Sequence, residues 1–527
     1  MAASEISVDI SQAMSTQPVA AADWLIVAPL VITAMGGALC LMLRKNTRLQ
    51  PVVGVAVLLL LVAACGALLA RVIDHGVLTM VAGNWLPPFG IAFTVDPLGA
   101  TLAFSSSIVA LAAGVYAMTD IDTSGRRYGF YPFLLLMMTG VCGAFLTGDL
   151  FNLYVWFEVL LISSFGLLVL GNERSQLDGA VKYALLNIIA TTLFLIATGL
   201  LYGILGTLNM ADIAIKVRSA GMSGPLLTVA VLFFLAFAMK AAAFPVNFWL
   251  PASYHTPRIV VAAVFAGLLT KVGVYALLRI FGLMMPEGRE ILGDLIALVA
   301  IATMLTGVCG AIAQTDVRRL LGYLVISGIG SMLAGLAIGT TPALGGAVFY
   351  AVHSIIVMTA LYMAAGMMNG LGGSYSLREL GGLYRISPAF AAVFLMLGFA
   401  VAGLPPFSGF WPKVILVDAA LQTGHGWIAG AILVTGFLTT IAVGRVWIYA
   451  FWRGGAEGVA DGSLTTFSVP APGATGANVW IPLLVLLAIV VLLGVQPEPM
   501  MQLAGKGAAS LSDPLGYLRS VFGEAAQ

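Results

Sequence analysis

Long apolar runs recur along the whole chain and are cut at glycines, prolines and charged clusters. Most runs approach or exceed the roughly 20 residues that an α-helix needs to cross the hydrocarbon core of a bilayer. Backbone polar groups cannot stay unpaired in lipid, so such runs fold as helices. Hydrophobic residues make up 60% of the chain and charged residues only 9%, which excludes a soluble globular domain. The sequence therefore predicts an all-α, polytopic membrane protein.

The apolar runs predict about fourteen transmembrane helices. They lie near 24–43, 51–71, 95–118, 129–147, 150–170, 178–204, 224–247, 258–281, 290–313, 317–339, 343–369, 388–423, 425–451 and 478–497. The run 388–423 is too long for one straight span and contains GLPPFSGFWPK, so we expect a broken helix there.

Four segments outside these runs carry expectations of their own. Loop 72–94 contains NWLPPFG and is predicted to form a short hairpin over the outer face. Residues 207–219 have the pattern of an amphipathic helix at the membrane interface. The polar tail 498–527 is predicted to be either an interfacial helix or disordered. The polar segment 1–23 lacks a basic region followed by an apolar core, so no cleavable signal peptide is expected.

Charge in the loops predicts the orientation. With the N-terminus outside, more of the loop arginines and lysines fall inside than outside, as the positive-inside tendency requires. The inner set is Arg44, Lys45, Arg48, Arg126, Arg127, Arg174, Lys182, Arg258, Arg318, Arg319, Arg378, Arg385 and Arg453. The outer set is Arg71, Lys216, Arg218, Arg289, Lys506 and Arg519. One missed or extra helix in this count would invert the predicted orientation of the second half of the chain.

Ionisable residues inside the apolar runs are the strongest indication of function. A charge at the centre of a membrane span costs roughly 2.5–3.5 kcal/mol on insertion scales, so such residues are rare without a use. Glu158 lies mid-way along its run, Lys240 lies five residues before Pro245, and Lys271 lies mid-way along 258–281. The alternatives are a protonated, hydrogen-bonded glutamic acid and lysines that snorkel to the interface.

The second half of the chain carries two more such residues. Lys413 follows the break PPFSGFW, and His353 lies inside 343–369. A lysine near a shallow break could be an interfacial anchor, and a lone histidine is often only a hydrogen-bonded core residue. In a row of ionisable groups, however, a histidine suits proton relay, because its pKa lies near physiological pH.

Further polar residues lie nearer the ends of the predicted spans. His255, in the SYHTP turn, is expected at the inner mouth, and Asp149 is either a helix cap or a secondary site residue. Asp418 and Lys182 are also secondary candidates. Lys182, Arg279 and Arg445 are expected to snorkel rather than to relay protons.

Several classes of chemistry have no support in the sequence. There is no phosphate-binding Gly-Lys-Ser/Thr loop, CxxC set, GxGxxG motif or His-Glu-x-x-His motif. The four cysteines are scattered singly and are predicted to be core residues. A net charge of +1 gives no basic surface for nucleic acid. We therefore expect no cofactor, no metal and no enzyme activity of this chain's own. An ion gradient or partner subunits would supply the energy for transport.

A faint internal repeat supports transport. The segments FPVNFWLP (244–251) and PFSGFWPK (406–413) both place Phe-Trp after a proline, with another proline close behind. Each has an intramembrane lysine nearby, Lys240 or Lys413. Matched broken helices in two halves of a membrane protein are a pointer to the transport site of a transporter.

Five segments together resemble the proton-conducting antiporter-like subunits. This family comprises the Mrp sodium/proton antiporter subunits and the large pumping subunits of respiratory complex I and membrane-bound hydrogenases. The segments are GDLFNLYVWFEVLLISSFGLLVLG, KAAAFPVNFWLPASYHTP, VFAGLLTKVGVYALLRIF, QTDVRRLLGYLVISGIG and AGLPPFSGFWPK. The resemblance covers roughly residues 95–450. The length, the FGIAFTVDPLGA entry and the lack of a long C-terminal extension are most similar to D-type Mrp subunits.

The resemblance implies fourteen helices with two inverted five-helix repeats, each containing a broken helix. The repeats correspond to about 129–281 and 290–451. The first three helices occupy 24–128, the last helix 478–497, and the polar segments 1–23 and 498–527 flank them.

The resemblance also implies roles for individual residues. Glu158 and Lys240 correspond to a glutamate–lysine pair, Lys271 to a central lysine, Lys413 to the lysine of the second broken helix, and His353 to a histidine relay between them. The sequence departs from the family at Ser354 and Met358, which stand where a second histidine and a lysine are often found. Between Lys271 and Lys413 the relay would therefore depend on His353, hydroxyl groups and water.

The hypothesis is a proton-translocating subunit of a multisubunit Na⁺/H⁺ antiporter, multi-pass in the bacterial inner membrane. Its partners would be other membrane subunits of a hetero-oligomer, the lipid bilayer, and Na⁺ and H⁺ as transported ions. Two alternatives stay open: a pumping subunit of a complex I-type oxidoreductase or membrane-bound hydrogenase, and a non-conducting membrane scaffold.

Overall fold

The computed structural model describes residue 14, residues 19–455 and residues 476–523, so most of the predicted polar segment 1–23 lies outside it. Its N-terminal part contains η2 (Ala21–Asp23), α1 (Trp24–Met42), α2 (Leu49–His75), β1 (Leu78–Val81), η3 (Ala82–Asn84), β2 (Ala92–Val95), α3 (Pro97–Asp120) and α4 (Thr123–Tyr128). Next come α5 (Phe130–Leu146), α6 (Leu150–Leu168), α7 (Arg174–Leu205), α8 (Met210–Ala220), α9 (Gly224–Ala241), α10 (Trp249–Ser253), α11 (Ile259–Leu278) and η4 (Arg279–Met284).

The remaining elements form the C-terminal part of the bundle. They are α12 (Pro286–Ile291), α13 (Gly293–Ala313), α14 (Val317–Ile338), α15 (Thr341–Gly372), α16 (Leu383–Ile386), α17 (Pro388–Ala402), α18 (Phe410–Gln422), α19 (Gly426–Val446), η5 (Trp447–Trp452), α20 (Ala477–Val495), α21 (Glu498–Ser512) and α22 (Leu515–Phe522).

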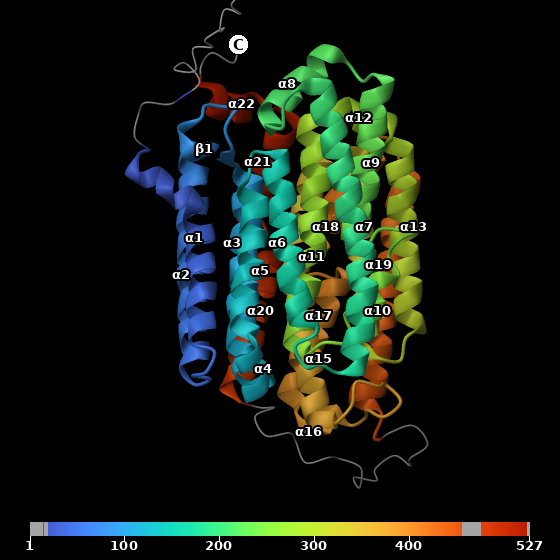
Figure 1. The fold of residues 1–527 in the computed structure, drawn as a ribbon. Helices are drawn as coiled ribbons and strands as arrows, with labels where there is room; N and C mark the ends of the chain where they lie inside the picture. Colours follow the sequence, from blue (N-terminus) through green and yellow to red (C-terminus); the bar gives the residue numbers. More distant parts are fainter. Residues whose placement is uncertain (1–13, 15–18, 456–475, 524–527) are drawn as a thin grey trace, which may run out of the picture.

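The long helices run side by side as one bundle (Figure 1). Within the described residues, twelve helices are long and apolar enough to cross a membrane, and Phe130–Leu146 and Pro388–Ala402 are shorter apolar helices. The all-α membrane architecture is confirmed, whereas the number fourteen stays a prediction. Elements α4 and α16 lie at one end of the bundle, and α8, α12 and α22 lie at the other (Figure 1).

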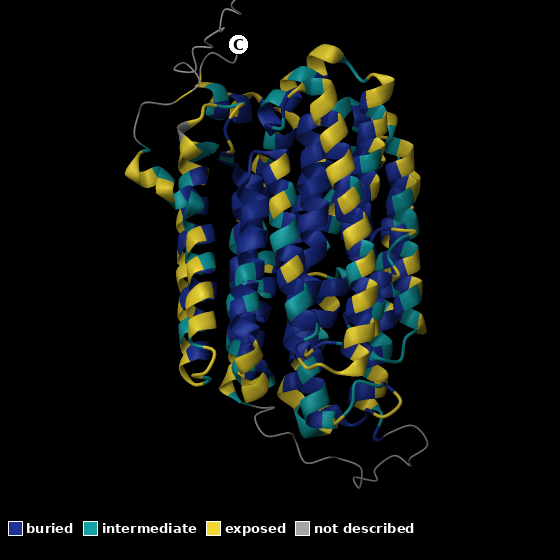
Figure 2. Ribbon diagram, in the orientation of Figure 1, coloured by how far each residue is buried: buried dark blue, intermediate teal, exposed yellow. Residues whose placement is uncertain are grey.

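The centre of the bundle is formed by α11 and α15. These two helices contact each other, and the most apolar 18 residues of each are all buried. The outer helices α1, α2, α7 and α20 are buried along one side only, and Figure 2 shows exposed residues along α2 and α7. A charge carried by α11 or α15 is therefore shielded from lipid by the surrounding helices.

Both predicted helix breaks are present. α9 stops at Ala241 and α10 resumes at Trp249, while α17 stops at Ala402 and α18 resumes at Phe410. The residue after each helix, Ala242 or Gly403, is in the left-handed region with φ of 60° or 86°. Left-handed backbone ends an α-helix, and the following prolines cannot continue it.

The two breaks share one backbone pattern. Ala243 N donates to Ala238 O and Val246 N to Ala243 O; Leu404 N likewise donates to Phe399 O and Phe407 N to Leu404 O. This pattern pairs the break after Ala242 with the break after Gly403, and Trp249 with Phe410. In this pairing the Phe-Trp pairs of the two segments, 248–249 and 410–411, are offset by one residue.

The predicted hairpin in 72–94 is present: β1 and β2 are antiparallel, with Leu78 opposite Val95. The segment 207–219 forms helix α8, as expected. The tail forms α21 and α22, and α21 packs on α3 and α15. Three cysteines are buried, but Cys309 is exposed on α13, which corrects the expectation of four core cysteines.

Candidate functional site

Lys240 lies in the last turn of α9, directly before the first break. Its side chain is buried, and its ammonium nitrogen lies 4.7 Å from the centroid of the Phe157 ring on α6. Trp249, at the start of α10, donates its indole N–H to the Met239 carbonyl at 3.0 Å. The break thus leaves Lys240 at a helix C-terminus inside the bundle, where the partial negative charge of the helix end favours a cation.

Glu158 is on α6, one residue beyond Phe157, and is only half-buried. The Glu158 carboxylate acts electrostatically on Lys240. Among the described residues, however, the two side chains form no ion pair with an N–O distance within 4 Å. Proton transfer between them therefore needs a bridging water molecule or a side-chain rotation. Phe151, Val155 and Ile162, on the same face of α6, are exposed.

Lys271 lies in the middle of α11 and is 1% exposed. Its ammonium group donates to the Ala266 carbonyl at 2.5 Å. α11 passes α9 closely at Gly273, where a Cβ atom would lie 2.8 Å from the backbone nitrogen of Ala241. This close approach places Lys240 and Lys271 on neighbouring turns of two touching helices.

His353, on α15, connects the central helix to the second break. Its Nδ1 atom lies 2.8 Å from the hydroxyl oxygen of Ser408, which is fully buried in the break. Lys271 and Lys413 both lie within electrostatic range of the imidazole. Ser408 was not singled out from the sequence, although its place in the PFSGFW turn next to a lysine was a usable signal.

Lys413 lies in the first turns of α18, beyond the second break. Its ammonium group donates to the carbonyl of Ala402, the last residue of α17, at 2.6 Å. This carbonyl is free to accept because the helix ends there. Lys413 also lines a cavity of about 610 Å³ between α18 and α19, together with the exposed Asp418.

Asp149 and Lys182 lie away from the row of Glu158, Lys240, Lys271, His353 and Lys413, whereas Asp418 shares helix α18 and a cavity with Lys413. Asp149 caps α6 by accepting a hydrogen bond from Asn152 N at 2.7 Å. Lys182 is half-exposed and pairs with Asp178 at 2.5 Å. Asp418 accepts a hydrogen bond from Gln422 Nε2 at 2.8 Å. The geometry thus brings together the helices of Lys240, Lys271, His353 and Lys413, with Asp418 beside Lys413, but it does not add Asp149 or Lys182.

The expectation that Arg279 snorkels is wrong. Arg279 is fully buried and forms a two-bond ion pair with Asp96, with N–O distances of 2.9 and 2.5 Å. Tyr275 OH accepts from its Nε atom at 3.0 Å, and Ser510 Oγ donates to Asp96 at 2.6 Å. Asp96 also caps α3 through Gly99 N. The pair joins segments too far apart in sequence for spacing to reveal it.

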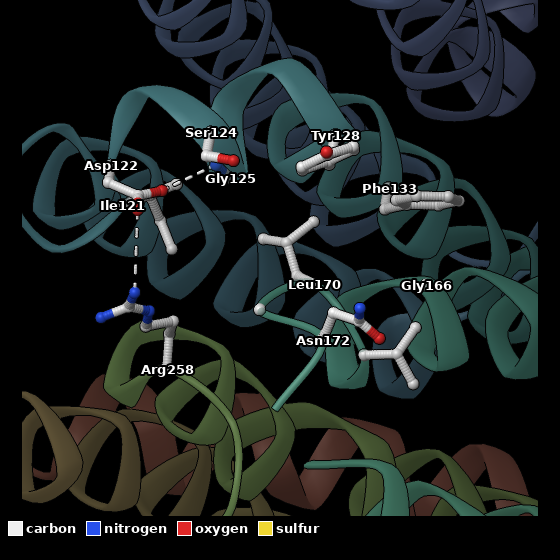
Figure 3. A pocket seen from close by; sticks show the side chains of 12 residues that line it. Ile121, Asp122, Ser124, Gly125, Tyr128, Phe133, Gly166, Leu170, Asn172 and Arg258 are labelled. Atoms are coloured by element: carbon white, nitrogen blue, oxygen red, sulfur yellow. Dashed lines mark hydrogen bonds and ion pairs between the residues drawn. The ribbon is translucent and has the colours of Figure 1, made fainter. Parts of the chain in front are cut away.

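A separate cavity of about 450 Å³ lies between α4, the end of α6 and the start of α11 (Figure 3). Asp122 accepts from Gly125 N and faces Arg258 at 3.8 Å (Figure 3). None of the five residues of the row lines it.

Comparison with known proteins identifies relatives of this chain. Residues 147–439 match the family model described as NADH:quinone oxidoreductase/Mrp antiporter, TM. The D subunit of the Na(+)/H(+) antiporter of Alkalihalophilus pseudofirmus is 38% identical over 95% of this chain and 99% of its own length. The chain belongs to the NADH:quinone oxidoreductase/Mrp antiporter family.

Solved structures extend the comparison. A chain of the Mrp complex from Dietzia sp. superposes with a TM-score of 0.88 at 29% identity, covering 96% of this chain and all of that one. A chain of an archaeal membrane-bound sulfane sulfur reductase gives a TM-score of 0.85 at 24% identity, with coverage of 95% and 100%, and shows the shared fold. The antiporter-family region of this chain contains all five residues of the row and both helix breaks.

Proposed function

We propose that this chain is the proton-carrying D-type subunit of a multisubunit Na⁺/H⁺ antiporter in the bacterial cell membrane. Protons move along Glu158, Lys240, Lys271, His353 and Lys413, with water and Ser408 between them. The names of the relatives support the cation and the complex. The partners are the other membrane subunits, and the ions exchanged are Na⁺ and H⁺.

One observation carries this proposal: four ionisable residues lie on the contacting elements α9, α11, α15 and α18, with Lys240, Lys271 and His353 buried and Lys413 partly buried beside the second break. Each can receive a proton and pass it to a neighbour, and each charge alters the proton affinity of the next, so the row titrates as a coupled system. Glu158 begins the row, and weaker attraction between Glu158 and Lys240 frees Lys240 to release its proton along the row.

Ser354 and Met358 are both buried on α15, so the steps from Lys271 to Lys413 depend on His353 and the Ser408 hydroxyl. A hydroxyl can both donate and accept a hydrogen bond and therefore suits proton transfer. We expect Ser408→Ala to slow antiport more than the equally conservative Ser510→Ala.

The test is antiport in everted vesicles from cells that express the whole complex. Lys240→Ala and Glu158→Ala should abolish Na⁺-dependent dissipation of the proton gradient while the complex still assembles. Lys45→Ala, at an exposed lysine in the α1–α2 turn, is the matched control and should leave antiport unchanged. Normal antiport in either test variant would count decisively against the row.

Two alternatives make different predictions. A subunit of a redox-driven complex would purify with hydrophilic redox subunits, whereas an antiporter subunit would purify with small membrane subunits only. A scaffold would tolerate neutral replacement at all five positions. Subunit composition and the substitutions together therefore separate the three functions.

A further inference from the structure

The cavity of about 450 Å³ beside α4 is charged at one end and apolar at the other (Figure 3). Asp122, Ser124 and Arg258 lie at the charged end, where α4 and α11 begin. The rings of Tyr128 and Phe133 lie at the opposite end (Figure 3). A cavity that joins charged groups to an apolar wall suits a ligand of the same two-part build, which is an amphiphile.

The charged groups in this cavity are not used up by contacts within the protein. Nη2 of Arg258 lies 3.8 Å from Oδ2 of Asp122, which is beyond hydrogen-bond distance. Among the residues that the structure describes, the Arg258 guanidinium donates no hydrogen bond, and Asp122 uses only Oδ1, which accepts from Gly125 N at 2.7 Å. The Arg258 and Asp122 side chains are 43% and 59% exposed. A guanidinium and a carboxylate oxygen are therefore both open to a ligand, side by side.

A second polar cavity at the same end of the bundle shows the opposite situation. It has a volume of about 410 Å³ and contains His255, the remaining secondary candidate, together with Asp178, Lys182 and Arg319. Asp178 is paired with Lys182 at 2.5 Å, and Nη2 of Arg319 lies 3.0 Å from Nε2 of His255. Because its charged groups contact one another, this second cavity is a matched control for the first.

The apolar end of the first cavity continues onto the outer face of the bundle. Gly166 on α6 lines the cavity, and Ile162, one turn earlier on the same face of α6, is 63% exposed. Tyr128 is 70% exposed, and tyrosines are common where a membrane protein meets the headgroup region of the bilayer. A ligand held at the charged end can thus extend along the membrane-spanning helix α6 into the hydrocarbon region.

The charges of the lining determine which headgroup fits. Arg258 can bind a phosphate, whereas Asp122 repels anions and accepts hydrogen bonds from an ammonium group. Asp120 adds a second carboxylate, because its charge acts on Arg258 while its Oδ2 accepts from Val260 N at 3.1 Å. A headgroup with only negative charge is therefore disfavoured, and a choline ammonium has no N–H to donate. A phosphate joined to a primary ammonium satisfies both sides.

We propose that this cavity binds the headgroup of phosphatidylethanolamine, with the phosphate on Arg258, the ammonium on Oδ2 of Asp122 and the acyl chains along α6. Loop charge predicts that this end of the bundle faces the cytoplasm, so the lipid belongs to the inner leaflet. The bound lipid joins α4 to the start of α11. None of the five residues of the proton row lines the cavity, so the lipid site does not depend on the proposed function.

The experiment counts the lipids bound to the purified, delipidated complex by native mass spectrometry. The complex is incubated with detergent micelles that contain phosphatidylethanolamine, phosphatidylcholine or phosphatidylglycerol. At low lipid concentration the wild-type complex should bind one more phosphatidylethanolamine than the Asp122→Asn or Arg258→Gln complex. Loss of one charge-assisted hydrogen bond should weaken binding at this site about tenfold.

The variants should differ in lipid preference. Asp122→Asn keeps a side-chain oxygen that can cap α4 but loses the negative charge, so the site should accept phosphatidylglycerol as well as phosphatidylethanolamine. Arg258→Gln should bind neither lipid tightly. Asp178→Asn and Arg319→Gln, in the control cavity, should keep the wild-type lipid count.

Two results would overturn the lipid site. One is equal binding of the three lipids by the wild-type complex, or an unchanged count in Asp122→Asn, which is decisive even if Arg258→Gln fails to assemble. The other comes from glycerophosphoethanolamine, the same headgroup without acyl chains, which should not compete with the lipid at equal concentration. If it competes, the cavity binds a free headgroup, and the assignment to a membrane lipid is wrong.

Discussion

The lysines beside the two helix breaks are held by carbonyl groups and helix ends rather than by carboxylates. Lys240 lies in the last turn of α9, and Lys413 donates to the last carbonyl of α17. A helix C-terminus carries a partial negative charge and unpaired carbonyls, so it stabilises an ammonium group without fixing its proton as a close carboxylate would. Each break thus places a lysine beside the C-terminal end of a helix.

Arg279, unlike these lysines, is held by a carboxylate: it forms a buried ion pair with Asp96. Asp96→Asn should leave Arg279 buried without a counter-charge, at a cost of about 3–5 kcal/mol. We expect a large fall in the Tm of the purified complex and partial recovery in the double variant Asp96→Asn/Arg279→Met.

The control for this pair is Asp178→Asn, which breaks the exposed pair with Lys182. An exposed ion pair contributes about 0–1 kcal/mol, so its Tm should stay close to the wild-type value. Equal effects of the two asparagine substitutions would contradict a structural role for the buried pair.

At the scale of helices, the close approach of α9 and α11 brings the turns that carry Lys240 and Lys271 together. Gly273 allows the approach because it has no Cβ atom. Close packing of this kind is common where small residues face each other in membrane bundles. The lysines are therefore positioned by a glycine that is not itself ionisable.

Gly273→Ala should push α9 and α11 apart, because the new methyl group would meet the Ala241 backbone nitrogen. Overpacking of this kind costs about 1–3 kcal/mol, and antiport should fall more than the amount of assembled complex. Gly199→Ala, on α7 where no atom lies within 4 Å of a Cβ, is the matched control and should be neutral. Vesicle antiport and quantitative blotting distinguish the two variants.

At the scale of the whole molecule, the C-terminal helices α21 and α22 pack against segments from distant parts of the chain. α21 packs on α3 and α15, and Ser510 on α21 donates to Asp96. Ser520 on α22 lies 2.7 Å from the hydroxyl of Thr79 on β1. The tail thus joins the N-terminal hairpin, the central helix and the buried ion pair at one end of the bundle.

Removal of residues 498–527 should uncover Asp96 and Arg279 to water and loosen α15. We expect a lower Tm of the purified complex and lower antiport, while Lys506→Ala, at an exposed position of α21, should change neither. If the complex with the truncated chain kept the wild-type Tm, the tail would not stabilise the bundle.

Local residue patterns were enough to predict the helical membrane architecture, the two broken helices and the residues of the proposed row. Backbone groups in lipid must be paired within helices, and charges in apolar runs stand out against their neighbours. The register of the breaks, the partner of Arg279, the Ser408–His353 contact and the separation of Glu158 from Lys240 became apparent only from the folded bundle. These features depend on contacts between helices far apart along the chain, which no local pattern of residues specifies.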